Sequence, residues 1–353
     1  MSGRPMTSKQ RVLTAMAHQE PDRVPQLLAT TLAGARELGL SIPDYLARAD
    51  HVVEGQLRMQ RRFGNDCYLG FLYGALEYEA FGGEVIMVDD GPPNSGAPVV
   101  VDPERILDLQ PPDPRRDPKL RRTLDLIAGL KERGDPEVPI MGVAIAPFSL
   151  PVMQLGFPAY LDLMHDRPDL LSHLLAVNEE FCVAWANAQF AAGITAVTYF
   201  DPLASPTNVP PDTYRTVGLP VARRVLARLD GPAAAHVASG RVLPVLDDLI
   251  GLGVAGVGVG DLEPPGRIKA VCRGRTTMIG NLNGIAMSRW TADQAEAEVK
   301  ALLAAAGPGG GFILSDGHGE LPWQVPDDVI LAVSAAVHEW GRYPLDWVGG
   351  CEP

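Results

Sequence analysis

Two histidines that follow apolar segments of strand length are the clearest candidates for chemistry in this chain. His236 ends a run of small apolar residues that begins at Ala233, and His318 lies in a Gly-His-Gly turn after the run 311–315. Such a turn holds a histidine at a strand tip, not inside a core. If both strands belong to one parallel barrel, the histidines share a rim, where they could ligate a metal or act as acid and base. The alternative is that both are structural histidines with satisfied hydrogen bonds.

A metal at this rim would need more ligands, because a catalytic zinc ion usually takes three protein ligands and keeps one position open. We assign His236, His318 and Glu79 as the metal set. Asp201, which opens a loop at a predicted strand end, is a catalytic candidate, as a further ligand or an orienting group. Asp316 could be a ligand but could equally cap a turn. Glu79 could also face solvent or pair locally.

The order of apolar runs and helical patterns predicts an α/β fold, a single (β/α)8 TIM barrel. About eight runs read as strands, and helical patterns follow most of them. A doubly wound sheet is the alternative. The barrel is favoured because polar residues gather at the C-terminal ends of several strands, the face that holds active sites in barrels. Near these ends we assign substrate-binding roles to five residues: Thr31, Glu77, Phe148, Asn281 and Asn283.

One domain over residues 1–353 is expected, because no repeat or low-complexity linker divides the chain. Residues 84–102 look like two short strands around a turn rich in Gly and Pro, a hairpin-like excursion from the barrel pattern. We expect this excursion to cover the mouth of the barrel.

The composition excludes several classes of protein. The net charge is −13, with 30 Lys and Arg against 43 Asp and Glu, so a nucleic-acid partner is not expected. No apolar run is long enough to span a bilayer, and the first ten residues lack a signal peptide's apolar segment. Four scattered cysteines fit a reducing cytoplasm. Phosphate-loop, nucleophile-elbow and Cys-x-x-Cys motifs are missing from the sequence. A homodimer is an open expectation.

Several stretches together resemble the uroporphyrinogen decarboxylase superfamily over nearly the whole chain. They are RVLTAMAHQEPDRVP, LEYEAFGGEV, GVAIAPFSLPVMQLG, YFDPLASPTNVPPDTYRTVGLP, HVASGRVLPVLDDLIGLGVAGVGV, MIGNLNG and GGFILSDGHGELPWQVPDDVI. Within the superfamily, the chain looks more like the corrinoid-linked branch, such as the methylcobalamin:coenzyme M methyltransferases. The resemblance implies a single (β/α)8 barrel, in agreement with the strand count.

The decarboxylase branch is metal-free and uses arginines to hold substrate carboxylates. Its arginine pair falls in ATTLAGAR, where only Arg36 could substitute, and its serine falls at Pro202. Its aspartate position falls near Tyr73, which we include among the catalytic candidates. Only the turn with His318 is retained, so decarboxylation of a porphyrinogen is not expected.

The methyltransferase branch binds zinc through a His-x-Cys pair and a later Cys. His236 matches the histidine, whereas Ala238 and His318 occupy the cysteine positions. A metal held here would have more nitrogen or oxygen ligands, which suits activation of an oxygen or a methoxy group. Alternatively, the metal is lost and the two histidines act as acid and base.

The resemblance therefore implies a methyltransferase or demethylase acting on a small molecule at the barrel mouth. Zinc and methylcobalamin on a partner corrinoid protein are the implied cofactors. One alternative is a metal-independent decarboxylase or lyase of a small carboxylic acid with His318 as proton donor. Another is a barrel that binds a small molecule without catalysis.

Overall fold

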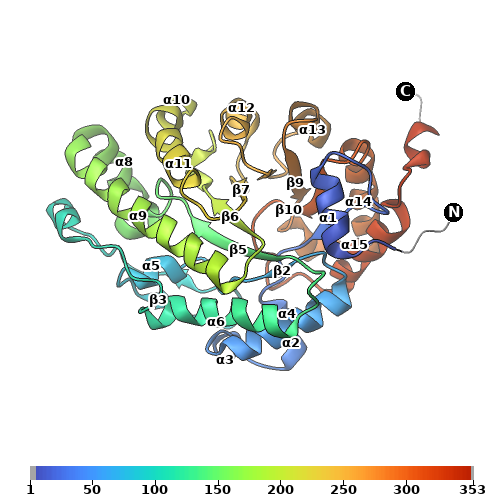
Figure 1. Ribbon diagram of the computed structural model, residues 1–353, viewed down its shortest axis with the longest axis horizontal. Coiled ribbons are helices and arrows are strands. Elements are labelled where there is room, and N and C mark those ends of the chain that lie inside the picture. Colours follow the sequence, from blue (N-terminus) through green and yellow to red (C-terminus); the bar gives the residue numbers. More distant parts are fainter. Residues whose placement is uncertain (1–4, 351–353) are drawn as a thin grey trace.

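The computed structural model describes residues 5–350, and within them eight parallel strands form one curled sheet of (β/α)8 type (Figure 1). The strand order is β1-β10-β9-β8-β7-β6-β5-β2, so neighbours in the sheet are mostly neighbours in the chain. The barrel prediction is confirmed. The strands are β1 (Gln26–Leu27), β2 (Tyr68–Leu69), β5 (Ile140–Ile145), β6 (Ala196–Phe200), β7 (Ala233–His236), β8 (Gly256–Gly258), β9 (Thr277–Leu282) and β10 (Phe312–Asp316).

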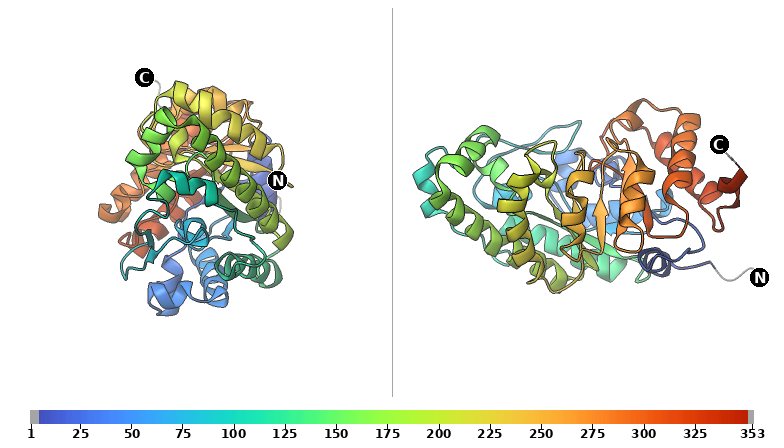
Figure 2. Two further views of the ribbon diagram at one scale, coloured as in Figure 1. Left: turned by 90° about the vertical axis from the view of Figure 1, so that its left-hand side faces the viewer. Right: turned by 90° about the horizontal axis from the view of Figure 1, so that it is seen from above.

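Helices surround the sheet, as two perpendicular views show (Figure 2). Their apolar faces pack on the strands, and their ends carry ordinary capping signals. Thr7 and Thr291 each form a capping box, and Gly64 ends α4 in a left-handed conformation. The helices are α1 (Ser8–Met16), α2 (Ala33–Leu38), α3 (Ile42–Leu46), α4 (Ala49–Phe63), α5 (Leu76–Ala80), α6 (Pro118–Arg133), α7 (Pro151–Leu155), α8 (Phe157–Asp166), α9 (Pro168–Ala192), α10 (Pro211–Thr213), α11 (Leu219–Leu226), α12 (Leu246–Ile250), α13 (Pro265–Cys272), α14 (Ala292–Ala306) and α15 (Asp327–Trp340).

The excursion at 84–102 contains a two-stranded antiparallel hairpin, formed by β3 (Val85–Ile86) and β4 (Asn94–Ser95). It lies at the end of the molecule that also carries α8, whereas α1 and α13–α15 gather at the other end (Figures 1 and 2). The hydroxyl of Tyr78 donates to the carbonyl of Ala97, and the amide of Gln324 donates to the carbonyl of Asp90 at 2.8 Å. These bonds tie the hairpin to the barrel on both sides.

The seam between β1 and β2 is closed by side chains, because these two strands stand at opposite edges of the strand order. The amide of Asn65 accepts from the N–H of Leu28 and donates to its carbonyl, each at 3.0 Å. The N–H of Asp66 donates to the carbonyl of Gln26 at 2.8 Å, and the carboxylate of Asp66 accepts the N–H of Gln26 at 2.9 Å. Two consecutive residues before β2 thus replace a strand ladder.

Asp66 also receives two buried arginines at this seam. The guanidinium of Arg11 lies 2.6 Å from its carboxylate and that of Arg23 lies 2.8 Å from it. Asp66 is completely buried, and the two arginines are 7% exposed. Arg11 also pairs with Asp22 at 2.7 Å, so two carboxylates together neutralise two guanidinium groups that could not be desolvated alone.

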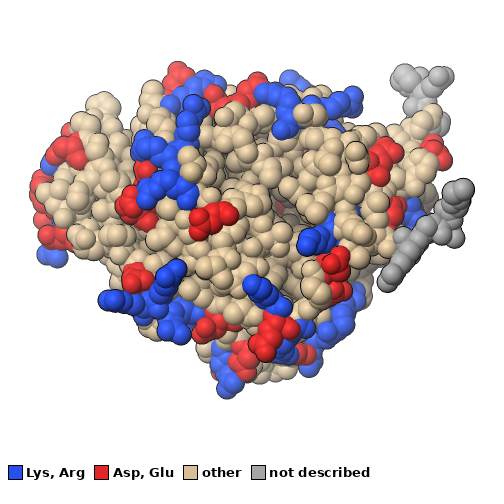
Figure 3. All heavy atoms as spheres, viewed as in Figure 1, with Lys and Arg blue, Asp and Glu red and all other residues tan. Residues whose placement is uncertain are grey.

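No described helix is long and apolar enough to cross a membrane. On the face shown in Figure 3, acidic and basic side chains are mixed around the periphery and do not form a single basic patch. Cys67, Cys182 and Cys272 are buried and unpaired, and Cys351 lies outside the described residues.

We expect Asp66→Asn to destabilise the protein by about 3 kcal/mol, because the variant keeps the shape but leaves the buried Arg23 without its carboxylate partner, whereas Arg11 keeps Asp22. Urea unfolding followed by circular dichroism would measure this. Asp50→Asn is the matched control, since the side chains of Asp50 and its partner Arg48 are 56% and 64% exposed. A midpoint for Asp66→Asn as close to wild type as that of the control would contradict the role given to the seam.

Candidate active site

A cavity of about 530 Å³ lies at the centre of the barrel and opens at the C-terminal ends of the strands. All eight strands of the sheet contribute lining residues. Most of the lining is apolar and includes Phe71, Phe157 and Phe200. Its polar side chains include His236, His318 and Glu320, and no lysine or arginine lies among the lining residues. The structure thus brings the two predicted histidines to one cavity.

His236 stands at the end of β7 and faces this cavity. Gly258 of the neighbouring strand makes room for the ring, because a Cβ there would lie 2.4 Å from the imidazole Cδ2. The imidazole Nδ1 accepts the N–H of Ala238 at 2.8 Å. Burial lowers the pKa of His236, the charge of Asp316 raises it, and His318 lowers it further, with burial the largest cause. The neutral ring therefore carries its hydrogen on Nε2, which is a hydrogen-bond donor.

Asp316 holds the turn that carries His318. Its carboxylate accepts the N–H groups of His318 at 3.2 Å and of Gly319 at 3.1 Å, and that of Ala29 at 3.1 Å. Three backbone donors thus fix the end of β10 against the chain that follows β1. The Nδ1 of His318 is buried and makes no hydrogen bond within the described chain.

Glu320 lies two residues beyond His318 and also lines the cavity. Its carboxyl accepts the N–H of Leu32 at 3.1 Å. Burial, with a smaller contribution from the charge of Asp316, raises the pKa of Glu320 to about 8, although the N–H of Leu32 opposes the shift. This carboxyl group therefore keeps its proton at neutral pH.

The residues at this site do not fit a zinc ion of the family type. His236 cannot offer Nε2 as a ligand while its Nδ1 accepts a backbone N–H, because the neutral ring has only one free nitrogen lone pair. Ala238 supplies no ligand. Across residues 5–350, no group of three His, Cys, Asp or Glu side chains is placed to hold a metal. The predicted set of His236, His318 and Glu79 is therefore not assembled in this structure.

Glu79 and Tyr73 pair with each other and do not line the cavity. The hydroxyl of Tyr73 donates to the carboxylate of Glu79 at 2.7 Å, and the ammonium of Lys119 lies 3.8 Å from that carboxylate. The pKa of Tyr73 is raised above its usual value, mainly by burial and next by Glu79. Arg36 does not reach the cavity either, because it bonds the carbonyls of Trp323 and Val325 and the carboxylate of Asp327.

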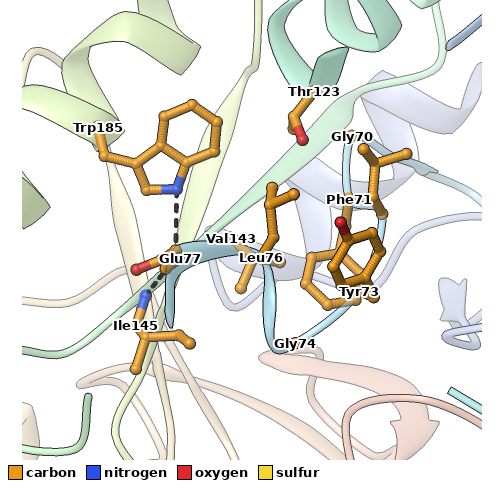
Figure 4. A pocket seen from close by; sticks show the side chains of 11 residues that line it. Gly70, Phe71, Tyr73, Gly74, Leu76, Glu77, Thr123, Val143, Ile145 and Trp185 are labelled. Carbon is orange, nitrogen blue, oxygen red and sulfur yellow. Dashed lines mark hydrogen bonds between the residues drawn. The ribbon is translucent and has the colours of Figure 1, made fainter. Parts of the chain in front are cut away.

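Glu77 is 4% exposed and lines a separate pocket of about 10 Å³, room for one water molecule at most (Figure 4). One of its carboxyl oxygens accepts the N–H of Ile145 at 2.9 Å and the indole N–H of Trp185 at 3.1 Å. Burial raises the pKa of Glu77 to about 8, and these two bonds oppose the shift. Glu77 therefore ties α5 to β5 and α9 as a neutral acid.

The other predicted site residues are engaged within the fold. Thr31 is buried, and the amide of Asn281 donates to the carbonyl of Gly260 at 3.0 Å. Asn283 donates to the carboxylate of Asp261 at 2.6 Å. None of the three lines the cavity. Their substrate-binding roles remain predictions that the geometry does not favour.

Asp201 and Phe148 lie just behind the cavity wall. Asp201 is 1% exposed and accepts the hydroxyl of Ser149 at 2.5 Å. Phe148 is buried between the rings of Tyr160 and Tyr214, with centroids 6.3 and 6.1 Å away. Asp201 therefore reaches the cavity only through Ser149, which does line it.

Sequence reasoning missed Ser149 and Glu320, both of which line the cavity. A signal existed for both. Ser149 comes directly after Phe148, beyond a predicted strand end, and Glu320 follows the Gly-His-Gly turn. We expect the excursion at 84–102 to cover the mouth of the barrel, and its residues 92–95 do line the cavity.

Residues 7–340 match the family described as uroporphyrinogen decarboxylase (URO-D). The chain belongs to this family. A methylcobamide:CoM methyltransferase MtaA of Methanosarcina barkeri is 27% identical over 224 residues, which cover 63% of this chain and 64% of that protein. This chain thus spans just under two thirds of that relative's length. A uroporphyrinogen decarboxylase of Xylella fastidiosa is 27% identical over 362 residues, 94% of this chain and 98% of its own.

A methyltransferase from Methanosarcina mazei shares the fold, with a TM-score of 0.79, 22% identity, and coverage of 95% of this chain and 99% of its own. Relatives thus include both branches of the superfamily. The cavity lining of this URO-D family member has neither arginines nor cysteines, the residue types that the resemblance implies for the decarboxylase and methyltransferase branches.

We expect Glu77→Gln to gain stability relative to wild type as the pH rises. The folded carboxyl has a pKa near 8 and the unfolded one near 4.5, so the folded state binds more protons in this window. Wild-type stability falls with pH there, by up to about 1.4 kcal/mol per pH unit from this group. Gln keeps both accepted hydrogen bonds and cannot ionise.

Urea unfolding at pH 5 and pH 8 would measure this difference, with Glu298→Gln on the exposed face of α14 as the control. A constant difference between Glu77→Gln and wild type at the two pH values would show that Glu77 is ionised in the fold.

Proposed function

We propose that this chain transfers the methyl group of a small, uncharged methyl ether to an acceptor, using proton transfer within the cavity in place of zinc chemistry. The observation that carries the proposal is the lining of the cavity. It combines an apolar wall with His236, His318 and Glu320, and includes no lysine or arginine. Of the family's two named activities, this lining favours methyl transfer over decarboxylation.

A carboxylic acid is a poor match for such a cavity. Carboxylates are held by charge-assisted hydrogen bonds, usually from arginine. Here the ionisable side chains of the lining are two histidines and two carboxyl groups, Asp316 and Glu320. An anionic substrate would be desolvated beside like charge without a cationic partner. The lining therefore supports a neutral substrate over the small acid that a decarboxylase or lyase would need.

Glu320 is the proposed general acid. Breaking the bond between the methyl carbon and the ether oxygen leaves the electron pair on oxygen, and that oxygen needs a proton. A carboxyl group with a pKa near 8 holds this proton at neutral pH and can release it to the forming alkoxide or phenoxide. Solvent then reprotonates Glu320. The methyl acceptor supplies the electron pair of the new bond to carbon.

His236 is the proposed orienting donor. Its Nδ1 is held by the N–H of Ala238, so its Nε2–H points a neutral donor into the cavity. A donor in an apolar site interacts more strongly with charge that develops on oxygen than it would in water. The family resemblance implies a corrinoid on a partner protein as methyl donor or acceptor. For an ether substrate, the reduced corrinoid would be the acceptor and would supply the nucleophile.

We expect the purified protein to retain well below one zinc per chain after incubation with zinc and dialysis, because a stable site needs about three protein ligands. Elemental mass spectrometry would measure the content. The double variant Ala238→Cys/His318→Cys restores the ligand types that the family resemblance implies. It is the matched comparison and should bind more zinc than wild type. A stoichiometric zinc content in wild type that is lost in His236→Ala would overturn the metal-free proposal.

We expect anisole and guaiacol to be demethylated in the presence of cob(I)alamin, and 4-methoxybenzoate to react at least about tenfold more slowly, since its carboxylate finds no cation. The absorbance of methylated cobalamin follows the reaction. Turnover of none of the neutral ethers, or faster turnover of the acid, would reject the proposal. Binding of anisole without any turnover would favour a non-catalytic barrel.

Glu320→Gln should lower the rate by about 10²-fold or more, because the amide cannot release a proton. Wild-type activity should fall as the pH rises through about 8, where Glu320 ionises, and the variant should lose this limb. Glu298→Gln is again the control. A Glu320→Gln variant with an unchanged pH profile would assign the proton to another group.

A further inference from the structure

The hydroxyl group of Ser149 makes two hydrogen bonds at the cavity wall. Ser149 lies between the end of β5 and the start of α7, and it lines the cavity. Its hydroxyl oxygen accepts the N–H of Leu203 at 3.0 Å and its hydrogen goes to the carboxylate of Asp201 at 2.5 Å. One lone pair of the hydroxyl is left over, because a serine oxygen has two.

Asp201 faces only neutral groups from the elements packed around it. Tyr160 of α8, Tyr199 of β6, Tyr214 of the π-helical turn Tyr214–Gly218, and Cys182 of α9 are the titratable side chains near its charge. The three tyrosine hydroxyls and the outer carboxyl oxygen of Asp201 make no hydrogen bond within the part of the chain that is described. The carboxylate has no cationic partner among these groups.

This environment brings the protonation of Asp201 into the neutral range. Burial raises its pKa to about 7, and the hydrogen bonds from Ser149 and from the backbone of Ala204 oppose the shift. Near neutral pH both the ionised and the protonated form of Asp201 are therefore populated. The direction of the hydrogen bond between Ser149 and Asp201 depends on which form is present.

We propose that Ser149 and Asp201 form a hydrogen-bond switch in the cavity wall, in which the protonation state of Asp201 decides what Ser149 presents to a bound molecule. When Asp201 is ionised, it accepts the hydroxyl hydrogen, and Ser149 shows the cavity its free lone pair. When Asp201 is protonated, the hydroxyl of Ser149 rotates so that one of its lone pairs accepts the carboxyl O–H, and its hydrogen turns to the cavity. The same side chain is thus an acceptor above the transition and a donor below it.

Ser149 is therefore a specificity-determining residue, and Asp201 is a positioning residue that acts through it. For the proposed ether substrate, on which this role depends, only the donor form can hydrogen-bond the oxygen. An alcohol or phenol product can instead donate to the acceptor form. The switch would then favour substrate below the transition and product above it.

Two neutral probes of similar size test the switch directly, acetophenone as an acceptor and phenol as a donor. Both would be titrated calorimetrically at pH 5.5 and 8.5 into the full chain carrying Glu320→Gln. This substitution removes Glu320, the lining carboxyl group whose pKa is raised to about 8. We expect acetophenone to bind roughly three- to tenfold more tightly at the lower pH and phenol at the higher pH, the size of one hydrogen bond.

The variants separate the switch from general effects of pH. Ser149→Ala should lose both pH dependences, and Ser149→Thr should keep them. Asp201→Asn should bind acetophenone equally at both pH values, because its amide donates to Ser149 as the protonated acid does. The same pH trend for both probes, or a dependence that survives in Ser149→Ala, would overturn the proposal.

Infrared spectroscopy of the unliganded chain decides the matter without any ligand. In the difference spectrum against Asp201→Asn, which cancels the bands of Glu77 and Glu320, a carboxylic acid band should titrate near pH 7 and shift to a higher midpoint when Ser149→Ala is introduced. The absence of such a band rejects the switch even if methyl transfer is found. Its presence supports the switch even if neither probe binds and no turnover is seen, which would reject only the proposed function.

Discussion

Closure of the barrel seam is the constraint on which the cavity depends. The strands β1 and β2 are two residues long and stand at opposite edges of the sheet order. The side chains of Asn65 and Asp66 join them, and Asp66 pairs with two buried arginines, of which Arg11 also pairs with Asp22. Only a closed ring of strands places His236, at the end of β7, in the same cavity as the turn after β10. The polar network at the seam is therefore a condition for the chemistry at the centre of the barrel.

Within that ring, the absence of lining cations sets the electrostatics of the site. Three carboxyl groups in or near the barrel centre, Glu77, Asp201 and Glu320, have pKa values raised by burial. In a uroporphyrinogen-type cleft, arginines would lower such values and hold anionic substrates. Here the acids keep protons at or near neutral pH and become donors. The absence of lysine and arginine from the cavity lining thus accounts for both the poor match to carboxylate substrates and the protonated carboxyl groups.

The differences from the methyltransferase branch form a consistent set. Ala238 replaces a thiolate ligand, yet its N–H donates to Nδ1 of His236 and fixes the tautomer. Its φ of 54° is unusual for a residue with a Cβ, so the turn holds this conformation at some cost. His318 sits on a turn held by the carboxylate of Asp316. Hydrogen-bond donors thus occupy the positions where the family resemblance implies metal ligands.

The sequence by itself determined the barrel and the strand-end positions of the two histidines. These features follow from local periodicity and from spacing, which a single chain displays directly. The change of ligand types at Ala238 and His318 is instead what the family resemblance implies. The sequence also identified Asp201 as a polar residue at a strand end and Glu79 as an available carboxylate ligand, and the family resemblance added Tyr73. It could not show that Glu79 and Tyr73 bond each other, or that Asp201 reaches the cavity only through Ser149.

Those outcomes were decided by tertiary structure, because the direction of a side chain after a strand depends on packing between distant elements. The tautomer of His236 depends on one backbone N–H, the space for its ring on Gly258 of the next strand, and the proton on Glu320 on burial by the assembled barrel. Sequence fixes which groups are present at the rim. Only the closed fold sets their protonation and the atoms they present.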